Sequence, residues 1–459
     1  MHEDFAAREF GGAELGDARL SRRLVRMGAA AMAMPAASLP KMMGTDAELE
    51  ATYRLLNHPS IVPEQVLAPH IRQTAERCRS RPLVYVAHDT TDLMFGGEVE
   101  RENLGRVRNK KAGFEAHVSI AVQPGLEARH MLGVLEVQRI NAHKSDQSGR
   151  SGRSLNGDDR WFLGVRSAER SLGGEVEAIH VMDRASDSYQ LWARMMAAGY
   201  RFVSRLSKNR MLDSTHKLFD HLAKLAEQPA QLNRDVVLSR RGKQRGSVLR
   251  KIHPVRDRRK AKLEVRASRV VIPMPDYCRG HDVPPELQLN IVHVREVNVP
   301  EGCDPVDWKL VTTDAIDTEQ QLAEIVDAYR ARWVIEEYFK ALKTGCAIEK
   351  RQLESYEGLA MVLALLAPVA WRLLQLRALA EAEPQRPATE VLNPLQLKIL
   401  RAKSRDPFPD NPTVADACFA IARLGGFLKH NKRPGWQVLG RGLHDLLLME
   451  EGASALIGT

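Results

Sequence analysis

The sequence has too few cysteines, spaced too widely, to support a disulfide framework. Its five cysteines are odd in number, and no two of them form a C-x-x-C pair. A small disulfide-rich domain or a structural zinc cluster needs cysteines that are close together and matched in number. The cysteine pattern therefore argues against both kinds of protein.

The sequence also lacks a recognisable secretory signal and an uninterrupted membrane span. Its opening residues, MHEDFAAREF, contain neither a basic n-region nor an apolar h-region. The most apolar segment, residues 358–380, is interrupted by Pro368 and Arg372 and falls short of the run of about 20 apolar residues that a span needs. We expect a cytoplasmic protein in which this segment is a buried helix.

Positive charge is what the sequence has in excess. Its 459 residues carry a formal net charge of +9, which favours a polyanionic partner. Nucleic acid is the leading candidate, and an anionic membrane surface is the alternative. The length exceeds that of one typical domain, so we expect about two to four domains.

The two ends of the chain are predicted to be helical. In residues 1–75, Arg19, Arg22 and Arg23 alternate with leucines at helical spacing. Small basic helical bundles are common DNA-binding modules, although a basic helix face alone is weak evidence. After about residue 366 the apolar spacing is again helical, with two linker-like stretches.

The middle of the chain predicts an α/β layer and a β-rich insertion. Buried or alternating apolar runs indicate strands, and the last of them is followed by a helix and another strand; the runs are residues 82–89, 116–124, 130–140 and 175–183. This order is typical of an α/β layer rather than a sandwich. Residues 211–310 then mix short β-rich runs with dense Lys and Arg, which indicates a β-rich insertion with a basic edge or, alternatively, a solvated charged surface loop.

Two of the predicted strands end in aspartate, at Asp89 and Asp183. A carboxylate at the end of a buried strand can project at the rim of a sheet, where α/β proteins build their sites. The alternative is an N-cap for the next helix. For Asp183 the capping interpretation is weaker, because Ser186 and Asp187 are better placed to cap the helix that follows.

The segment Tyr329 to Lys343, YRARWVIEEYFKALK, predicts one helix with a polar stripe. At about 100° per residue the stripe spans an arc of about 80° and contains Tyr329, Arg332, Glu336, Lys340 and Lys343. A neighbouring apolar arc contains Ala331, Ile335, Phe339 and Leu342. A charged stripe is usually a solvated face, so this one indicates a site only if it has partners elsewhere.

Asp89, Asp183 and Glu336 together would suit hard divalent cations. Mg²⁺ takes oxygen ligands, often one or two carboxylates with substrate phosphates in the other positions. Three converging carboxylates can therefore hold two ions for an in-line phosphoryl transfer. Arg332, Lys340, Lys343 and Tyr329 would then meet the neighbouring phosphates.

These residues resemble a known family, the DDE transposases of bacterial insertion sequences, and within it the insertion-sequence 4 family. Its signature Y-x-x-R-x-x-x-E-x-x-x-x-x-x-K is matched at every gap by Tyr329, Arg332, Glu336 and Lys343. The family's D-T-T and D-R-x-x-D stretches are similar to HDTTDL at Asp89 and DRASD at Asp183. Similar stretches occur in the same order over nearly the whole chain.

The resemblance implies the fold and the domains. It implies an α/β, ribonuclease H-like catalytic core over 76–210 and 311–365, interrupted by a β-rich insertion at 211–310. It also implies a helical domain at 1–75 that binds DNA ends, and a helical dimerisation domain at 366–459. The partners implied are the inverted-repeat ends of the transposon, target double-stranded DNA and a second copy of the chain, in the bacterial nucleoid.

The resemblance also implies roles for individual residues. Asp89, Asp183 and Glu336 are expected to bind Mg²⁺, with Mn²⁺ as a substitute, for DNA nicking, hairpin formation and strand transfer. The expected phosphate contacts are Tyr329, Arg332, Lys340, Lys343, Arg205 and Lys208, and the candidates for end binding are Arg19, Arg22 and Arg23. Trp308 is the candidate for supporting a flipped base, with a core tryptophan at a strand start as the alternative.

Other functions stay open from the sequence. One is a non-catalytic DNA-binding protein descended from a transposase, and another is a ribonuclease H-like nuclease that hydrolyses DNA without joining it. Asp92 adds a fourth carboxylate near Asp89 and could tune the site or act as a cap. His117 is interpreted as a satisfied histidine rather than a base.

Overall fold

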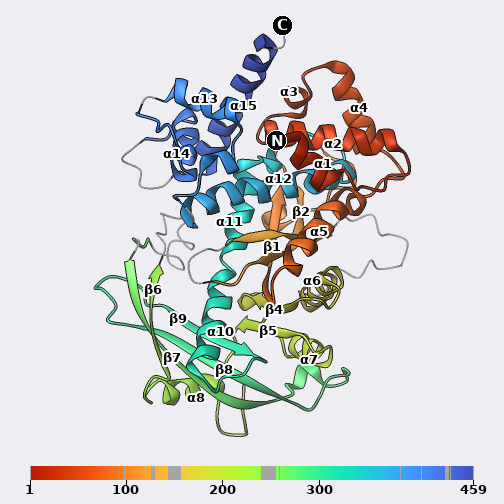
Figure 1. The fold of residues 1–459 in the computed structure, drawn as a ribbon. Helices are drawn as coiled ribbons and strands as arrows, with labels where there is room; N and C mark the ends of the chain where they lie inside the picture. The colour runs from red at the N-terminus through yellow and green to blue at the C-terminus, as the bar shows by residue number, and fades with distance from the viewer. Residues whose placement is uncertain are drawn as a thin grey trace. The chain divides into compact units, whose positions relative to one another are not determined.

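The computed structural model divides into two compact units, which are described separately below (Figure 1). The first unit contains residues 1–156, 163–177 and 333–459, and the second contains 157–162 and 178–332. The structure describes residues 2–97, 100–125, 130–142, 157–238, 255–257, 259–382, 384–404, 406–428, 434 and 436–457. The basic stretch 239–254 of the predicted insertion and most of the polar stretch 141–159 therefore lie outside the described residues.

The first unit begins with helices, as the sequence predicted. They are α1 (His2–Phe10), α2 (Ala18–Ala33), α3 (Leu39–Met43), α4 (Asp46–Leu56) and α5 (Pro63–Arg79). Local chemistry sets their starts: Asp17 accepts a hydrogen bond from the Arg19 N–H at 2.7 Å to cap α2, and Thr45 caps α4 in the same way. α2 buries Leu24 and Met27, so its basic residues stay on the opposite face.

An antiparallel sheet of β1 (Leu83–Met94), β2 (Gly113–Val122) and β3 (Met131–Ile140) follows these helices. β2 is the middle strand, and β1 pairs with it so that Asp89 lies opposite Val118. α5 packs on β3. α6 (Gly157–Leu172) approaches β2 at Gly164. A Cβ atom on residue 164 would lie 2.8 Å from Nε2 of His117, which is on β2. Only glycine therefore lets α6 approach β2 this closely.

The most apolar segment forms a single long helix, α12 (Tyr356–Ala382), which continues through Pro368. It packs on α2, α5 and β3. The expectation that it falls short of a membrane span was wrong in length, because Tyr356–Gln375 is long and apolar enough to cross a bilayer. However, 89% of its most apolar window is buried inside the protein, so the expectation of a buried helix is confirmed.

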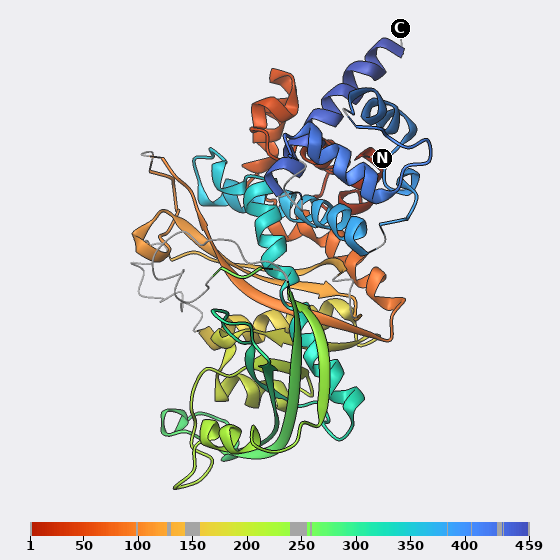
Figure 2. The same ribbon diagram turned by 90° about the vertical axis from the view of Figure 1, so that its left-hand side faces the viewer.

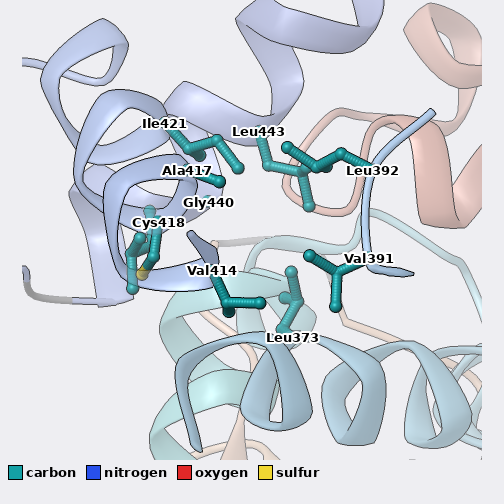
Figure 3. A pocket seen from close by; sticks show the side chains of 10 residues that line it. Leu373, Val391, Leu392, Val414, Ala417, Cys418, Ile421, Gly440 and Leu443 are labelled. Carbon is teal, nitrogen blue, oxygen red and sulfur yellow. The ribbon is translucent and has the colours of Figure 1, made fainter. Parts of the chain in front are cut away.

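The remaining helices of the first unit are α11 (Val334–Lys340), α13 (Pro394–Lys403), α14 (Val414–Leu424) and α15 (Trp436–Ile457). α12, α14 and α15 enclose a cavity of about 30 Å³ (Figure 3). Its lining is apolar and includes Leu373, Val414, Ile421 and Leu443. A cavity of this size holds about one water, which needs polar partners, so we interpret it as a small packing void.

The second unit is built on a mixed sheet. Its strands are β4 (Glu177–Met182), β5 (Arg201–Arg205), β6 (Leu232–Leu238), β7 (Arg259–Pro273), β8 (Glu286–Val297) and β9 (Asp307–Thr312). They lie in the order β4-β5-β9-β8-β7-β6, with β4 and β5 parallel and the other pairs antiparallel. The helices are α7 (Tyr189–Ala197), α8 (Leu218–Leu225) and α10 (Glu319–Ala331). The long strands β7 and β8 run side by side, drawn in green in Figure 2.

The single helix predicted for Tyr329–Lys343 was wrong. α10 ends at Ala331, α11 begins at Val334, and a π turn follows at Ala341–Gly345. Arg332 and Trp333 between the helices keep right-handed helical dihedral angles, so neither Gly nor Pro marks the break. The predicted stripe is therefore divided: Tyr329 and Arg332 belong to the second unit, and Glu336, Lys340 and Lys343 to the first.

A buried polar network connects α1, α5, β3 and α12 in the first unit. His70 Nδ1 lies 2.6 Å from Glu9 Oε2, and His70 Nε2 accepts a hydrogen bond from the Val134 N–H at 3.1 Å. Arg77 donates to Glu9 at 2.8 Å and stacks 4.1 Å from the centre of the Trp371 ring. Nδ1 must therefore carry the proton of a neutral His70 ring.

Stability should fall on acidification because of His70. Burial lowers the pKa of His70 below its ordinary 6.5, and the opposing hydrogen bond to Glu9 does not offset it. As the pH falls, His70 is therefore protonated in the unfolded chain at a higher pH than in the folded protein. The free energy of unfolding should be constant above about pH 6.5 and fall below it, by at most about 1.4 kcal/mol per pH unit. Urea denaturation between about pH 7.5 and 5.5 should show this slope in the native protein and a shallower one in His70→Gln. Equal slopes would contradict it.

Candidate functional site

The first unit brings the helix of Glu336 onto the strand of Asp89. α11 packs against β1, and its apolar side chains Ile335 and Phe339 are 0% and 8% exposed. Asp89 and Glu336 themselves are half-buried. The buried apolar side of α11 therefore holds Glu336 against the strand that carries Asp89.

Lys343 lies at the end of β1. The π turn rotates the chain after α11, because the Cys346 N–H reaches back to the Ala341 carbonyl at 2.8 Å. Lys343 Nζ then donates to the Asp92 carbonyl at 2.5 Å and lies 3.5 Å from Glu349. Glu349 in turn accepts a hydrogen bond from the Met94 N–H at 3.0 Å. Lys343 is therefore anchored beside β1.

The residues around Asp89 on β1 have partners on β2. His88 Nδ1 lies 2.8 Å from the Ser119 hydroxyl, and Thr90 Oγ1 lies 2.9 Å from His117 Nδ1. His117 is fully buried, so it is a core histidine rather than a surface one. The fourth carboxylate, Asp92, forms an ion pair with Arg108 at 3.3 Å, which gives it a partner on the loop before β2.

In the second unit, Asp183 caps a short turn directly after β4. Its carboxylate accepts a hydrogen bond from the Ala185 N–H at 2.8 Å and so begins the 3₁₀ turn Arg184–Ser186. The cap of α7 is Ser188. The expectation that Ser186 or Asp187 caps that helix was therefore wrong, because the intervening turn shifts the start of α7 by one residue or more. Asp183 remains half-buried at the end of its strand.

Asp187, which the sequence interpretation treated only as a cap, has a different role. It is 2% exposed and accepts hydrogen bonds from the N–H groups of Ser207 at 2.5 Å and Lys208 at 2.7 Å. Lys208 is exposed, and Arg205 donates to the Asp307 carbonyl at 3.1 Å. The only sequence signal for this role was the second aspartate of DRASD.

Trp308 and Tyr329 pack against each other in the second unit. Their rings meet edge to face with centroids 5.2 Å apart, and the Arg332 guanidinium lies 6.0 Å from the Tyr329 ring centre. Tyr329 and Arg332 are buried, whereas Trp308 is half-buried at the start of β9. The tyrosine and arginine of the predicted signature therefore lie with the predicted base-flipping tryptophan.

The three N-terminal arginines differ in environment. Arg23 forms an ion pair with Glu48 of α4, and that carboxylate also lies 3.4 Å from Arg26. Arg19 and Arg22 are exposed. Of the three candidates for end binding, Arg19 and Arg22 are therefore the better placed, because Arg23 would first have to leave Glu48.

The donor set suits a divalent cation, and its three carboxylates come from both units. Asp89 and Glu336 belong to the first unit and Asp183 to the second. Within the described residues, no group of three or more His, Cys, Asp or Glu side chains is arranged to hold a metal ion. Carboxylate oxygens are nevertheless the ligands that Mg²⁺ takes in proteins, so the chemistry of the three residues fits the ion.

Comparison with known families gives the site a context. Residues 2–61 match the family model of the transposase DNA-binding domain, and residues 166–370 match that of the transposase DDE domain. The chain therefore contains a transposase DNA-binding domain and a transposase DDE domain. The DDE domain contains Asp183 and Glu336, and Asp89 lies before its matched range. The sequence resemblance to DDE transposases is thus confirmed at the level of these domains.

Among solved structures, this chain is similar to a piggyBac transposase synaptic complex with hairpin DNA, which was determined by cryo-EM. The match covers 83% of this chain and 76% of that one, with 9% identity and a TM-score of 0.38. A likeness this distant carries no argument about the site.

Lys343 should contribute more to stability than its neighbour Lys340. Lys343→Ala removes the donor to the Asp92 carbonyl and the partner of Glu349, so we expect the free energy of unfolding to fall by about 1 kcal/mol. Lys340 is 53% exposed and pairs with Glu337 on the surface of α11, so Lys340→Ala should change it by less than about 0.5 kcal/mol. Urea denaturation measures both, and equal losses would argue against the anchoring of Lys343.

Proposed function

We propose that this chain is a cut-and-paste transposase of the insertion-sequence 4 type, which nicks DNA at the ends of its element and joins those ends to target DNA. The observation that carries the proposal is the match of residues 166–370 to the transposase DDE domain. The D-R-x-x-D motif at Asp183 and the Y-R-E-K motif at Glu336 both lie within this range. The packing of α11 on β1 supports it, because it holds Glu336 on the strand of Asp89.

Asp89, Asp183 and Glu336 are the proposed metal ligands of a ribonuclease H-like core. Bound Mg²⁺, or Mn²⁺ in its place, would lower the pKa of the attacking oxygen and stabilise the leaving oxygen. The protein's own contribution is to hold the carboxylates on rigid elements. Asp89 lies within a hydrogen-bonded strand, Asp183 caps the turn after β4, and Glu336 lies on a helix with a buried apolar face.

Basic and aromatic side chains are proposed to bind the DNA backbone. The proposed phosphate contacts are Arg205, Lys208, Lys340, Lys343, Tyr329 and Arg332. Tyr329 and Arg332 are buried, so their contacts require the side chains that cover them to move when DNA binds. Trp308 is proposed to support a flipped base during hairpin formation, since a half-buried indole can stack on a base. Its packing on Tyr329 would fix the ring for that contact.

The proposed domains follow from the same function. Residues 1–75 would bind the inverted-repeat ends, in agreement with the DNA-binding match to residues 2–61, with Arg19 and Arg22 as phosphate contacts. Residues 211–310 form the proposed insertion in a core of 76–210 and 311–365. Residues 366–459 are proposed to form the contact between two copies of the chain.

The direct test is removal of one carboxylate. Glu336→Gln, Asp89→Asn and Asp183→Asn should each reduce Mg²⁺-dependent nicking of duplex DNA carrying the element's own ends at least about a hundredfold, because even indirect partners of metal ligands cost 10- to 100-fold. Glu337→Gln is the matched control on the same helix, because its carboxylate pairs with Lys340. Undiminished cleavage in Glu336→Gln would refute the assignment, and cleavage without joined products would identify a nuclease.

Trp308 can be tested separately from nicking. Trp308→Ala should leave first-strand nicking intact and reduce the hairpin product several-fold, because the flipped base loses about 1–3 kcal/mol of stacking. Trp308→Phe keeps an aromatic ring and should retain most of it. Denaturing gels of end-labelled DNA distinguish nicked from hairpin products. Equal hairpin yields in the native protein and Trp308→Ala would remove Trp308 from the mechanism.

A further inference from the structure

The carboxylate of Asp187 is buried against a single loop of the second unit. Its Oδ2 accepts the N–H groups of Ser207 and Lys208 and also the Ser207 hydroxyl at 3.0 Å. Its Oδ1 lies 2.5 Å from Arg210, whose side chain is 8% exposed. A buried carboxylate is tolerated only when it is paired and hydrogen-bonded. Ser207, Lys208 and Arg210, all within residues 207–210, supply these contacts to Asp187.

Further contacts fasten the same loop to the turn that begins at Asp183. The Ser207 hydroxyl donates to the Arg184 carbonyl at 3.3 Å, and the Ser186 and Ser204 hydroxyls lie 2.7 Å apart. Arg210 also donates to the Asp187 carbonyl at 3.1 Å and stacks 4.5 Å from the Trp192 ring centre. Ser207, Lys208 and Arg210 of the loop, and Ser204 in β5 before it, are therefore held by the segment after β4.

The loop carries two cations, and of these Lys208 is exposed whereas Arg210 is buried. Its backbone N–H is bound to Asp187, so its Cα is fixed relative to the Asp183 turn even though its ammonium is in solvent. A cation on a fixed backbone loses less conformational freedom when it binds an anion than a cation on a mobile loop does. Without the Asp187 carboxylate, the N–H groups of Ser207 and Lys208 would lose their acceptor, and Arg210 would lose its ion-pair partner.

We propose that Asp187 is a positioning residue for DNA binding. It holds the loop 207–210 so that the Lys208 side chain contacts a phosphate of the DNA strand on which Asp183 is proposed to act. The inference rests on the proposed transposase function and adds to it a residue that itself touches no DNA. The role is indirect, since the carboxylate faces the interior and would repel a phosphate if it faced out.

The test is the salt dependence of binding to a mixed-sequence duplex. Loss of one phosphate contact lowers the slope of log K against log salt by about 0.9. Lys208→Ala should show this loss, Asp187→Ala should show the same loss with its lysine intact, and the double variant should show no further loss. Asp187→Asn keeps an oxygen for the two N–H groups but loses the charge that pairs with Arg210, so its slope should lie between.

The matched control is Glu296→Ala. Glu296 is equally buried, at 1% side-chain exposure, and it also pairs with an arginine, Arg259, and accepts a backbone N–H, from Val306 at 3.0 Å. Its variant should lose stability but keep the native slope. A native slope in Asp187→Ala or in Lys208→Ala, or a reduced slope in Glu296→Ala, would overturn the inference. A native protein that binds DNA without salt dependence would instead overturn the proposed function.

Discussion

The buried position of β1 is the constraint on which the first unit depends. Residues 84–88 of the strand are buried, and the polar residues 89–92 that follow are half-buried. Buried polar groups need partners, and these come from distant parts of the sequence: Ser119 and His117 on β2, and Lys343 beyond α11. The contact of Lys343 with Asp92 accompanies the packing of α11 on β1, which holds the helix of Glu336 on the strand of Asp89.

In the second unit the turn after β4 has the equivalent organising role. Asp183 begins the turn, and Asp187 four residues later binds the loop that follows β5. Both carboxylates are held by backbone N–H groups, which leaves Asp183 half-buried and Asp187 enclosed. Two aspartates of one short motif therefore have different environments: one can reach a ligand, and the other serves the architecture around it.

The sequence was enough to predict most helices and strands, but not the division of the segment Tyr329–Lys343 between two helices and two units. The strands β1 to β5 were predictable because buried or alternating apolar runs are strong signals, and α12 was predictable as a core helix for the same reason. The break between α10 and α11 at Arg332 and Trp333 was not predictable. Both residues keep helical dihedral angles, and the helical periodicity of the sequence continues across them. The role of Asp187 was also hidden, because its partners at 207–210 are fixed only by tertiary contacts. Asp183, which caps a turn, and Asp187, which holds the loop 207–210, are distinguished by their burial and their hydrogen-bond partners rather than by residue type.

The central claim is that Asp89, Asp183 and Glu336 hold one divalent-metal site, and affinity cleavage measures this most directly. Fe²⁺ substituted for Mg²⁺ generates hydroxyl radicals with ascorbate and peroxide, and these cut the polypeptide next to the bound ion. The account predicts cuts close to all three residues in the DNA-bound protein, suppressed by excess Mg²⁺ and lost in Glu336→Gln. Cuts that cluster elsewhere, or that persist unchanged in Glu336→Gln, would contradict it.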